Sequence, residues 1–281
     1  MVQLLNGLQL AMLLFLLSVG LSIVLGLMNF INLAHGTLYM FGAYLGMSAV
    51  SATHSFWVAL VIAPLGTAIL GMALYQLLLR RLSGGNPMRQ ILLTFGVIYV
   101  GGETIRIIWG NDSHSIDPPA LLAGQVNVLG DSYPAYRLFI IALGLAAMTV
   151  LYFLLERTRV GAMVRASVDD RETAACLGIN TQALFLSVFG LGCLLAGLGG
   201  VIAGPVLSVY PGMDVAVLTY ILIVVVVGGP GSLPGAAFGS LFIGLFDTFG
   251  RVFFPQFSAF LVYALMAAFL LLRPGGFVAI R

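Results

Sequence analysis

Apolar segments about as long as a bilayer is thick follow one another along almost the whole chain. A helix needs roughly 20 apolar residues, at about 1.5 Å of rise each, to cross the hydrocarbon core of a membrane. We expect such segments at 8–28, 36–54, 57–79, 90–108, 137–155, 182–204, 214–229, 235–250 and 257–272. The repetition predicts an all-α, polytopic integral membrane helical bundle with about eight or nine crossings and no soluble domain.

The composition favours the same fold class. Of 281 residues, 60% are hydrophobic and only 8% are charged, whereas soluble domains carry roughly 25% charged residues. The net charge of +2 gives no reason to expect a nucleic-acid partner. Cys176 and Cys193 are too few for a disulfide framework or a zinc site. Residues 1–28 have no basic region before their apolar run, so we interpret them as a first membrane segment and not as a signal peptide.

The arginines predict the orientation of the bundle. If the segments alternate, one side of the membrane receives most of the 12 basic residues, namely Arg80, Arg81, Arg89, Arg157, Arg159, Arg165, Arg171, Arg273 and Arg281. An excess of basic residues marks cytoplasmic loops, so this side and the C-terminus are expected to be cytoplasmic. The 109–136 loop has no basic residue and is expected to be external, together with the N-terminus.

The longest cytoplasmic connection, at 157–180, is polar but patterned. Ser167 can cap a helix, with Asp170 three residues later, and Gly178 is a natural helix stop. These signals predict one short helix of about eight residues, with a small apolar face at Ala174 and Leu177. Such a segment is either a solvated connector or a protrusion that fits a groove of a partner.

No enzyme-like site is predicted, neither catalytic nor metal-binding. The three histidines have no metal-ligand spacing, and no phosphate-binding Gly-x-x-x-x-Gly-Lys-Ser/Thr motif is present. Charges within the apolar segments are sparse. Glu103 with Arg106, and Asp247 with Arg251, have the spacing of local helical pairs.

Three motifs together resemble one family. The pattern Gly161-x-x-x-Arg165-Ala166-x-x-x-Asp170-x-x-x-Ala174-x-x-x-Gly178-Ile179 is similar to the cytoplasmic coupling loop of the branched-chain amino acid ABC transporter permease family, in its LivH-type membrane subunit. The stretch from Gly26 to Gly36 with Gly42-Ala-Tyr44, and the stretch from Gly228 to Ala236, resemble the same family. The likeness covers nearly the whole chain.

The resemblance implies a single transmembrane permease domain over 1–281, with a coupling loop at 157–180 and an external loop at 109–136. It implies that a partner ATPase contacts Gly161, Arg165, Ala166, Asp169, Asp170, Ala174, Leu177 and Gly178. The 166–178 helix would act as a lever for alternating access. This chain would bind no cofactor, because ATP is used by the partner subunits.

The partners implied are a second homologous permease subunit, two cytoplasmic ATP-binding subunits and an external or periplasmic solute-binding protein, in a bacterial inner membrane. Branched-chain or related amino acids are the expected cargo. The alternatives are a urea or short-amide ABC importer, a stand-alone ion-coupled secondary transporter and a membrane scaffold.

Two Gly-rich stretches interrupt apolar segments, at 29–36 and 228–235. Irregular backbone at membrane depth survives where protein or a water-filled cavity satisfies it, and broken helices line substrate sites in many transporters. We therefore expect a translocation path lined or gated by Asn29, Asn32, His35, Gly36, Gly228, Gly229, Gly231 and Ser232. The alternative is a pair of interfacial turns, with His35 as a hydrogen-bonded structural residue.

Overall fold

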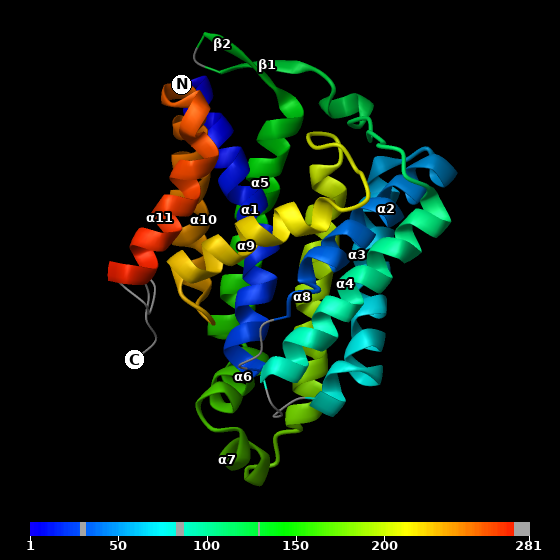
Figure 1. The fold of residues 1–281 in the computed structure, drawn as a ribbon, viewed down its shortest axis with the longest axis vertical. Helices are drawn as coiled ribbons and strands as arrows, with labels where there is room; N and C mark the ends of the chain where they lie inside the picture. The colour runs from blue at the N-terminus through cyan, green and yellow to red at the C-terminus, as the bar shows by residue number, and fades with distance from the viewer. Residues whose placement is uncertain (29–31, 83–86, 129, 273–281) are drawn as a thin grey trace.

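The computed structural model describes residues 1–28, 32–82, 87–128 and 130–272, and this part of the chain is almost entirely helical (Figure 1). The long helices are α1 (Val2–Met28), α2 (His35–Thr53), α3 (Phe56–Leu77), α4 (Pro87–Trp109), α5 (Ala135–Arg157), α8 (Thr181–Ala203), α9 (Met213–Gly228), α10 (Leu233–Phe253) and α11 (Ser258–Leu272). The shorter elements are α6 (Arg159–Asp169), α7 (Arg171–Cys176), η1 (Leu79–Leu82), η2 (Ala120–Leu122), η3 (Pro255–Phe257), β1 (Gln125–Val128) and β2 (Asp131–Pro134).

Each apolar segment expected from the sequence coincides with one of the long helices. Within the described ranges, six helices are long and apolar enough to cross a bilayer, namely α1, α3, α4, α5, α8 and α10. Helices α9 and α11 are apolar but shorter. The prediction of an all-α polytopic membrane bundle is confirmed, with helix breaks near both positions where the sequence placed them.

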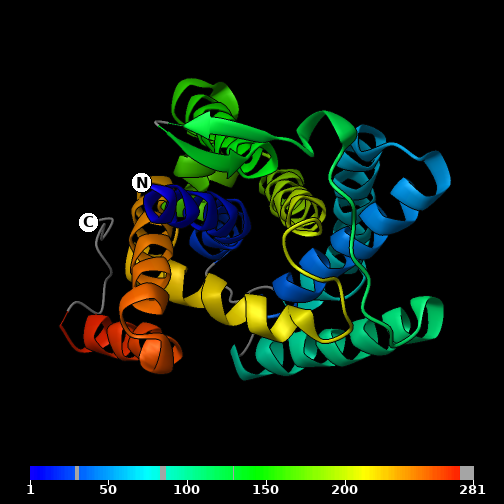
Figure 2. The same cartoon turned by 90° about the horizontal axis from the view of Figure 1, so that it is seen from above.

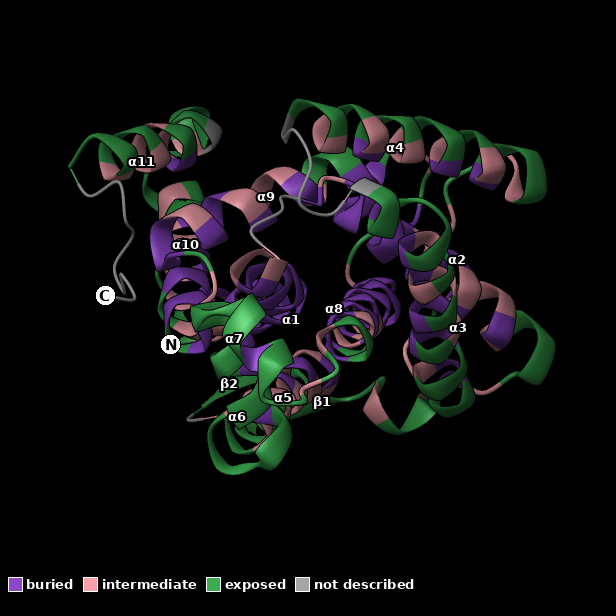
Figure 3. Cartoon of the chain, turned by 90° about the horizontal axis from the view of Figure 1, so that it is seen from below, coloured by how far each residue is buried: buried purple, intermediate pink, exposed green. Residues whose placement is uncertain are grey.

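Helices α1 and α8 form the centre of the bundle. In α1, 83% of the apolar stretch lies inside the structure, compared with 17% in α4, so α1 is a core helix and α4 a peripheral one (Figure 3). Helices α5, α9 and α10 pack around α1, while α2 and α3 pack on α8. Figure 2 shows α9 running across the bundle from the side of α2 to α10.

Glycines permit the closest helix crossings. A Cβ at Gly42 of α2 would collide with the backbone of Gly197 in α8, and a Cβ at Gly20 of α1 would meet the carbonyl oxygen of Gly192 at 2.8 Å. Small residues let helices approach closely in lipid, where van der Waals packing replaces the hydrophobic effect. Small residues recur every four positions in α2 (Gly42, Gly46) and at four-residue spacing in α8 (Gly192, Ala196, Gly200), and these glycines pack within this chain.

The two ends of the bundle differ. The N-terminus and the antiparallel hairpin β1–β2 lie at one end, and α6 and α7 lie at the other (Figure 1). The hairpin was not expected from the sequence. The Tyr133 hydroxyl of β2 joins the hairpin to α1 by donating to Asn6 Oδ1 at 3.1 Å, and Arg137 of α5 donates to the same oxygen at 2.7 Å.

Candidate functional site

The polar connection after α5 folds into two helices, whereas the sequence suggested one. Thr158 caps α6 by accepting a hydrogen bond from the Gly161 amide at 3.2 Å. Asp170 lies between the helices with an extended backbone and caps α7. The expected cap, Ser167, is instead buried inside α6, so the assignment of Ser167 and of a single 166–178 helix was wrong. The error arose because Thr158, before the start of α6, and Asp170, three residues after Ser167, supply the caps instead.

Both ends of α7 are closed by local hydrogen bonds. Asp170 accepts hydrogen bonds from the amides of Glu172 and Thr173, at 2.9 and 3.1 Å, and from the Thr173 hydroxyl. The Thr173 hydroxyl and amide stabilise the charged carboxylate and lower the pKa of Asp170 from its ordinary value. At the other end, Gly178 has φ +86° and stops the helix, as predicted. The Ile179 amide then donates to the Ala174 carbonyl at 3.1 Å, which is the pairing of a Schellman motif.

Helix α6 is anchored to the bundle along one face. Gly161, Val164 and Ser167 are buried along that face. A Cβ at Gly161 would collide with the Leu155 carbonyl, so only glycine lets α6 turn back this closely on the end of α5. Arg165 donates to the same Leu155 carbonyl and pairs with Glu156 at 3.4 Å. Gly161 and Arg165 therefore hold α6 in place.

The predicted coupling residues divide into an inner and an outer set. Gly161 and Ala174 face inward and are buried, and the Arg165 guanidinium is held by α5. The outer set is exposed and consists of Ala166, Asp169, Asp170, Leu177 and Gly178. The Leu177 side chain is 77% exposed at the tip of this end. Seen from this end, α6 and α7 are largely exposed (Figure 3).

A cavity of about 290 Å³ lies between α6 and the bundle. Its walls come from the end of α1, one side of α6 and the turn that begins α10, and include Gly26, Arg165, Asp169, Gly231 and Ser232. The structure thus brings part of the predicted coupling loop next to part of the second predicted helix break. This proximity was not predictable from the sequence.

The second break is a tight turn packed on α1. Gly229 and Gly231 have φ of +98° and +76°, a backbone region that favours glycine. A Cβ at Gly26 of α1 would collide with the backbone of Gly231. Ser232 caps α10 by accepting a hydrogen bond from the Gly235 amide at 3.0 Å. Gly228 and Gly235 pack backbone to backbone where α9 meets α10.

The first break lies deep in the bundle. Asn29 falls outside the described residues. The buried Asn32 accepts a hydrogen bond from the Ala34 amide at 3.2 Å, and His35 Nε2 donates to the Leu17 carbonyl at 3.0 Å. Leu17 precedes the end of α1 by eleven residues, or about 16 Å of helix. Helix α2 therefore begins well inside the membrane-spanning length of α1.

The start of α2 docks on the start of α9. Gly36 packs against the backbone of Asp214, and the Thr37 hydroxyl donates to the Asp214 carboxylate at 2.9 Å. Both side chains are buried. The first break therefore contacts Leu17 of α1 and Asp214 of α9, whereas the second contacts Ser22 and Gly26 of α1.

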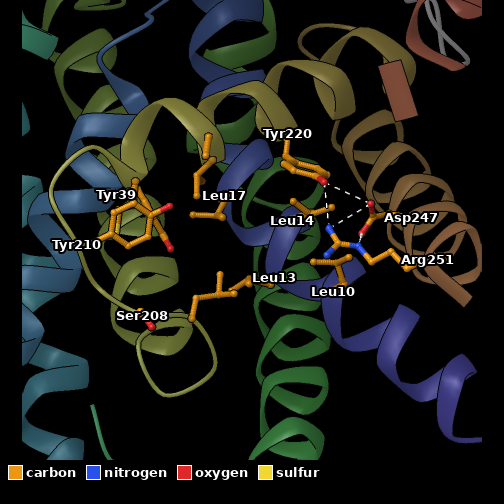
Figure 4. A pocket seen from close by; sticks show the side chains of 14 residues that line it. Leu10, Leu13, Leu14, Leu17, Tyr39, Ser208, Tyr210, Tyr220, Asp247 and Arg251 are labelled. Carbon is orange, nitrogen blue, oxygen red and sulfur yellow. Dashed lines mark hydrogen bonds and ion pairs between the residues drawn. The ribbon is translucent and has the colours of Figure 1, made fainter. Parts of the chain in front are cut away.

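A further cavity of about 360 Å³ lies beside α1, α9 and α10, with Tyr39 of α2 on one wall. Its polar corner joins three side chains (Figure 4). Arg251 Nε lies 2.8 Å from Asp247 Oδ2, and the Tyr220 hydroxyl donates to Asp247 Oδ1 at 3.3 Å. The four-residue spacing predicted the Asp247–Arg251 pair, but nothing in the sequence indicated that the pair borders a cavity. Glu103 and Arg106 also pair, at 2.6 Å, on the surface of α4.

These features define the class of the protein. Helices that break at membrane depth, and cavities beside them, are typical of membrane transporters. Among the described residues, no three His, Cys, Asp or Glu side chains come together in a metal-binding group. The chain is thus a multi-pass membrane protein with the architecture of a solute permease.

Comparison with known proteins gives the family. Residues 3–270 match the family described as "Branched-chain amino acid transport system / permease component". The chain is 28% identical to the high-affinity branched-chain amino acid transport system permease protein BraD of Pseudomonas aeruginosa, over 98% of this chain and 94% of BraD. It is 25% identical to the corresponding LivH of Escherichia coli K12, over the same shares. It also matches the fructose import permease protein FrcC of Rhizobium meliloti, at 29% over 57% of this chain and 45% of FrcC.

The chain therefore belongs to the branched-chain amino acid transport system permease family, as its three motifs indicated.

Proposed function

We propose that this chain is the membrane-spanning subunit of an ATP-driven importer, and that a separate ATPase docks on the outer set of α6–α7 residues. The supporting observation is the two-sided character of this segment. Ala166, Asp170, Leu177 and Gly178 are exposed, Asp169 is exposed at the border of the cavity under α6, and the opposite side of α6 packs on the bundle. Leu177 at the tip is 77% exposed, so its side chain is available to pack on a partner.

The contacts suggest how force would pass into the membrane. Arg165 holds α6 to the end of α5, and α6 borders the cavity that reaches Gly26 and Gly231. At that point α1 and the start of α10 touch backbone to backbone, with little space to absorb a displacement. Movement of α6–α7 by the ATPase would therefore tilt α1 and α10 as rigid bodies. Such tilting is one form of alternating access.

The relatives suggest the cargo and the partners. BraD and LivH are named as branched-chain amino acid permeases, so we propose branched-chain amino acids for this chain. We propose a second homologous permease subunit, two ATP-binding subunits that use the ATP, and an external solute-binding protein. This chain would itself bind no cofactor.

We further propose a bacterial inner membrane as the location. The end with α6–α7 and the C-terminus would face the cytoplasm. The N-terminus and the 109–136 loop would face outward, in a single permease domain over 1–281. The distribution of charge supports this orientation, because the arginines of η1, the last residue of α5 and the arginines of α6 and α7 lie toward the same end.

Reconstituted vesicles test the proposal. The chain is inserted with its candidate partner permease, ATPase subunits and solute-binding protein, and uptake of radiolabelled leucine is measured as each component is left out. We expect uptake only with ATP on the ATPase side and with every component present. Uptake by the chain alone, driven by an imposed proton or sodium gradient, would instead identify an ion-coupled carrier and reject the proposal.

A further inference from the structure

The cavity beside α1 has one apolar wall and one charged corner (Figure 4). The apolar wall is a row of leucines on α1, continued by α9, and consists of Leu10, Leu13, Leu14, Leu17, Met213 and Val217. The charged corner is Asp247 and Arg251 of α10 with Tyr220 of α9. Its volume of about 360 Å³ lies at the small end of ligand pockets, which span roughly 300–1,000 Å³.

The charged corner has unused binding capacity. The Asp247 side chain is 1% exposed, whereas that of Arg251 is 61% exposed and reaches open space. Arg251 uses Nε and Nη2 for its hydrogen bonds to Asp247 and Tyr220. In the described part of the chain, Nη1 donates no hydrogen bond, and a carboxylate offers about four lone-pair positions, of which Asp247 uses three.

A polar entrance leads to this corner. A second cavity of about 380 Å³ shares Leu10, Leu13, Leu207, Asp247 and Arg251 with the first. Its other walls are mostly polar and include Gln3, Asn6, Gln9, Arg137 and Thr248. These residues lie near the start of α1 and the end of α10, at the end of the bundle that carries the hairpin (Figure 1). A solute entering there would meet the ion pair before the leucines.

We propose that this cavity is a transport subsite for a zwitterionic amino acid with an aliphatic side chain. Asp247 accepts one hydrogen bond from the ammonium group, Arg251 donates to the carboxylate, and the leucines of α1 surround the side chain. This inference rests on the proposed function, because it assigns a position to the solute that the permease carries.

The chemistry of the cavity selects this class of ligand. Asp247 and Arg251 neutralise each other, so a ligand with one net charge would bring an uncompensated charge out of water, which is costly. A sugar has hydroxyl groups on all sides and would leave them unpaired against the leucine wall. Urea would leave the apolar part of the cavity empty. An amino acid carries adjacent opposite charges and one apolar branch, which match the corner and the wall.

Binding to the purified chain tests the inference without any ATPase. Equilibrium dialysis with radiolabelled leucine measures Kd in detergent, and unlabelled valine, isoleucine, fructose and urea serve as competitors. We expect valine and isoleucine to displace leucine, and fructose and urea to leave it bound. Asp247→Asn and Arg251→Gln should each weaken binding by at least about tenfold, because each removes one charge partner of the ligand.

Two sets of variants serve as controls. Glu103→Gln and Arg106→Gln break an exposed ion pair far from the cavity walls and should leave Kd unchanged. Ala216→Phe fills the cavity from α9 and leaves the ion pair intact. It should weaken leucine binding while the thermal unfolding temperature stays near that of the wild type. This variant separates loss of the site from loss of the fold.

The inference is overturned if the wild type binds no leucine up to about 10 mM, if fructose or urea displaces leucine, or if the charge variants bind as the wild type does. Failure of the inference and failure of the proposed function give different results. ATP-driven uptake without leucine binding in this cavity rejects only the subsite. Leucine binding together with ATP-independent uptake rejects only the importer mechanism.

Discussion

The Gly231 amide donates a hydrogen bond to the Ser22 carbonyl at 3.0 Å, and this bond joins the turn before α10 to the C-terminal half of α1. One turn further along α1, Gly26 packs directly on the Gly231 backbone. The central helix of the bundle is thereby fixed to the turn that borders the cavity under α6. Few contacts therefore separate α6 and α7 from α1, and we expect a displacement of α6 to be transmitted to α1 through the turn at Gly231.

Gly26→Ala should destabilise the protein. The new methyl group would collide with the Gly231 backbone, which cannot move without breaking its bond to Ser22. Overpacking of this kind costs about 1–3 kcal/mol in free energy of unfolding. Thermal unfolding in detergent measures the change. Gly96→Ala is the matched control, since a Cβ there meets nothing within 4 Å. Equal unfolding temperatures for the two variants would contradict the close contact.

Thr37→Val should loosen the junction of α2 and α9. Valine keeps the shape of threonine but cannot donate to the buried Asp214 carboxylate. An unsatisfied buried acceptor costs about 1–3 kcal/mol. Thr104→Val is the control, because the Thr104 hydroxyl is exposed and bonds only its own helix at the Val100 carbonyl. Chemical denaturation should separate the two variants, and a loss confined to Thr104→Val would argue against a buried bond at Asp214.

The Asp170 cap predicts a pH dependence for α7. Its hydrogen bonds to Thr173 and Glu172 lower the pKa, so the charged carboxylate favours the folded helix. The stabilisation is complete at neutral pH and is lost as the pH falls through the lowered pKa, below the ordinary value of 3.8. The protection of the α7 amides, expressed as their exchange rate relative to the unfolded chain at the same pH, should be unchanged at pH 5 and fall in stronger acid.

Asp170→Ala should accelerate the same exchange at neutral pH, because the amides of Glu172 and Thr173 lose their acceptor. Asp169→Ala is the neighbouring control, since Asp169 is also exposed but does not cap the helix. If both alanine variants exchange alike, Asp170 is not the residue that holds α7.

The orientation predicts opposite labelling of two exposed leucines. In a Cys176→Ser background the remaining cysteine, Cys193, is buried and should be silent. With an impermeant maleimide on intact cells, Leu121→Cys in the 109–136 loop should react. Leu177→Cys at the tip of α7 should react only after the membrane is opened. The reverse order would place the α6–α7 end outside and reject the cytoplasmic assignment.

The position of each membrane helix along the chain was largely predictable, because the thickness of a bilayer sets the length of an apolar helix. The segments expected at 137–155 and 182–204 match α5 and α8 to within two residues at each end. The level along α1 at which α2 begins was not predictable. Residues 29–36 read as a break, but nothing in the sequence says that His35 returns to the level of Leu17.

The site was predictable only in part. Gly178 stops α7 as expected, because its role depends on local backbone geometry alone. Ser167 misled the prediction, since two better-placed caps at Thr158 and Asp170 compete with it. The cavity at Asp247 and Arg251 depends on how α1, α9 and α10 meet. The four-residue spacing of Asp247 and Arg251 predicted their ion pair, but no local pattern could place that pair against the leucines of α1.

The central claim is that α6–α7 receives the movement of a separate ATPase, and the most direct measurement compares Leu177→Asp with Leu121→Asp. Both leucines are largely exposed, at 77% and 83%, so neither change should disturb the fold. ATP-driven leucine uptake is measured in vesicles that contain equal amounts of inserted protein. The account predicts that Leu177→Asp loses most uptake and Leu121→Asp keeps it. Full uptake by Leu177→Asp would contradict the account.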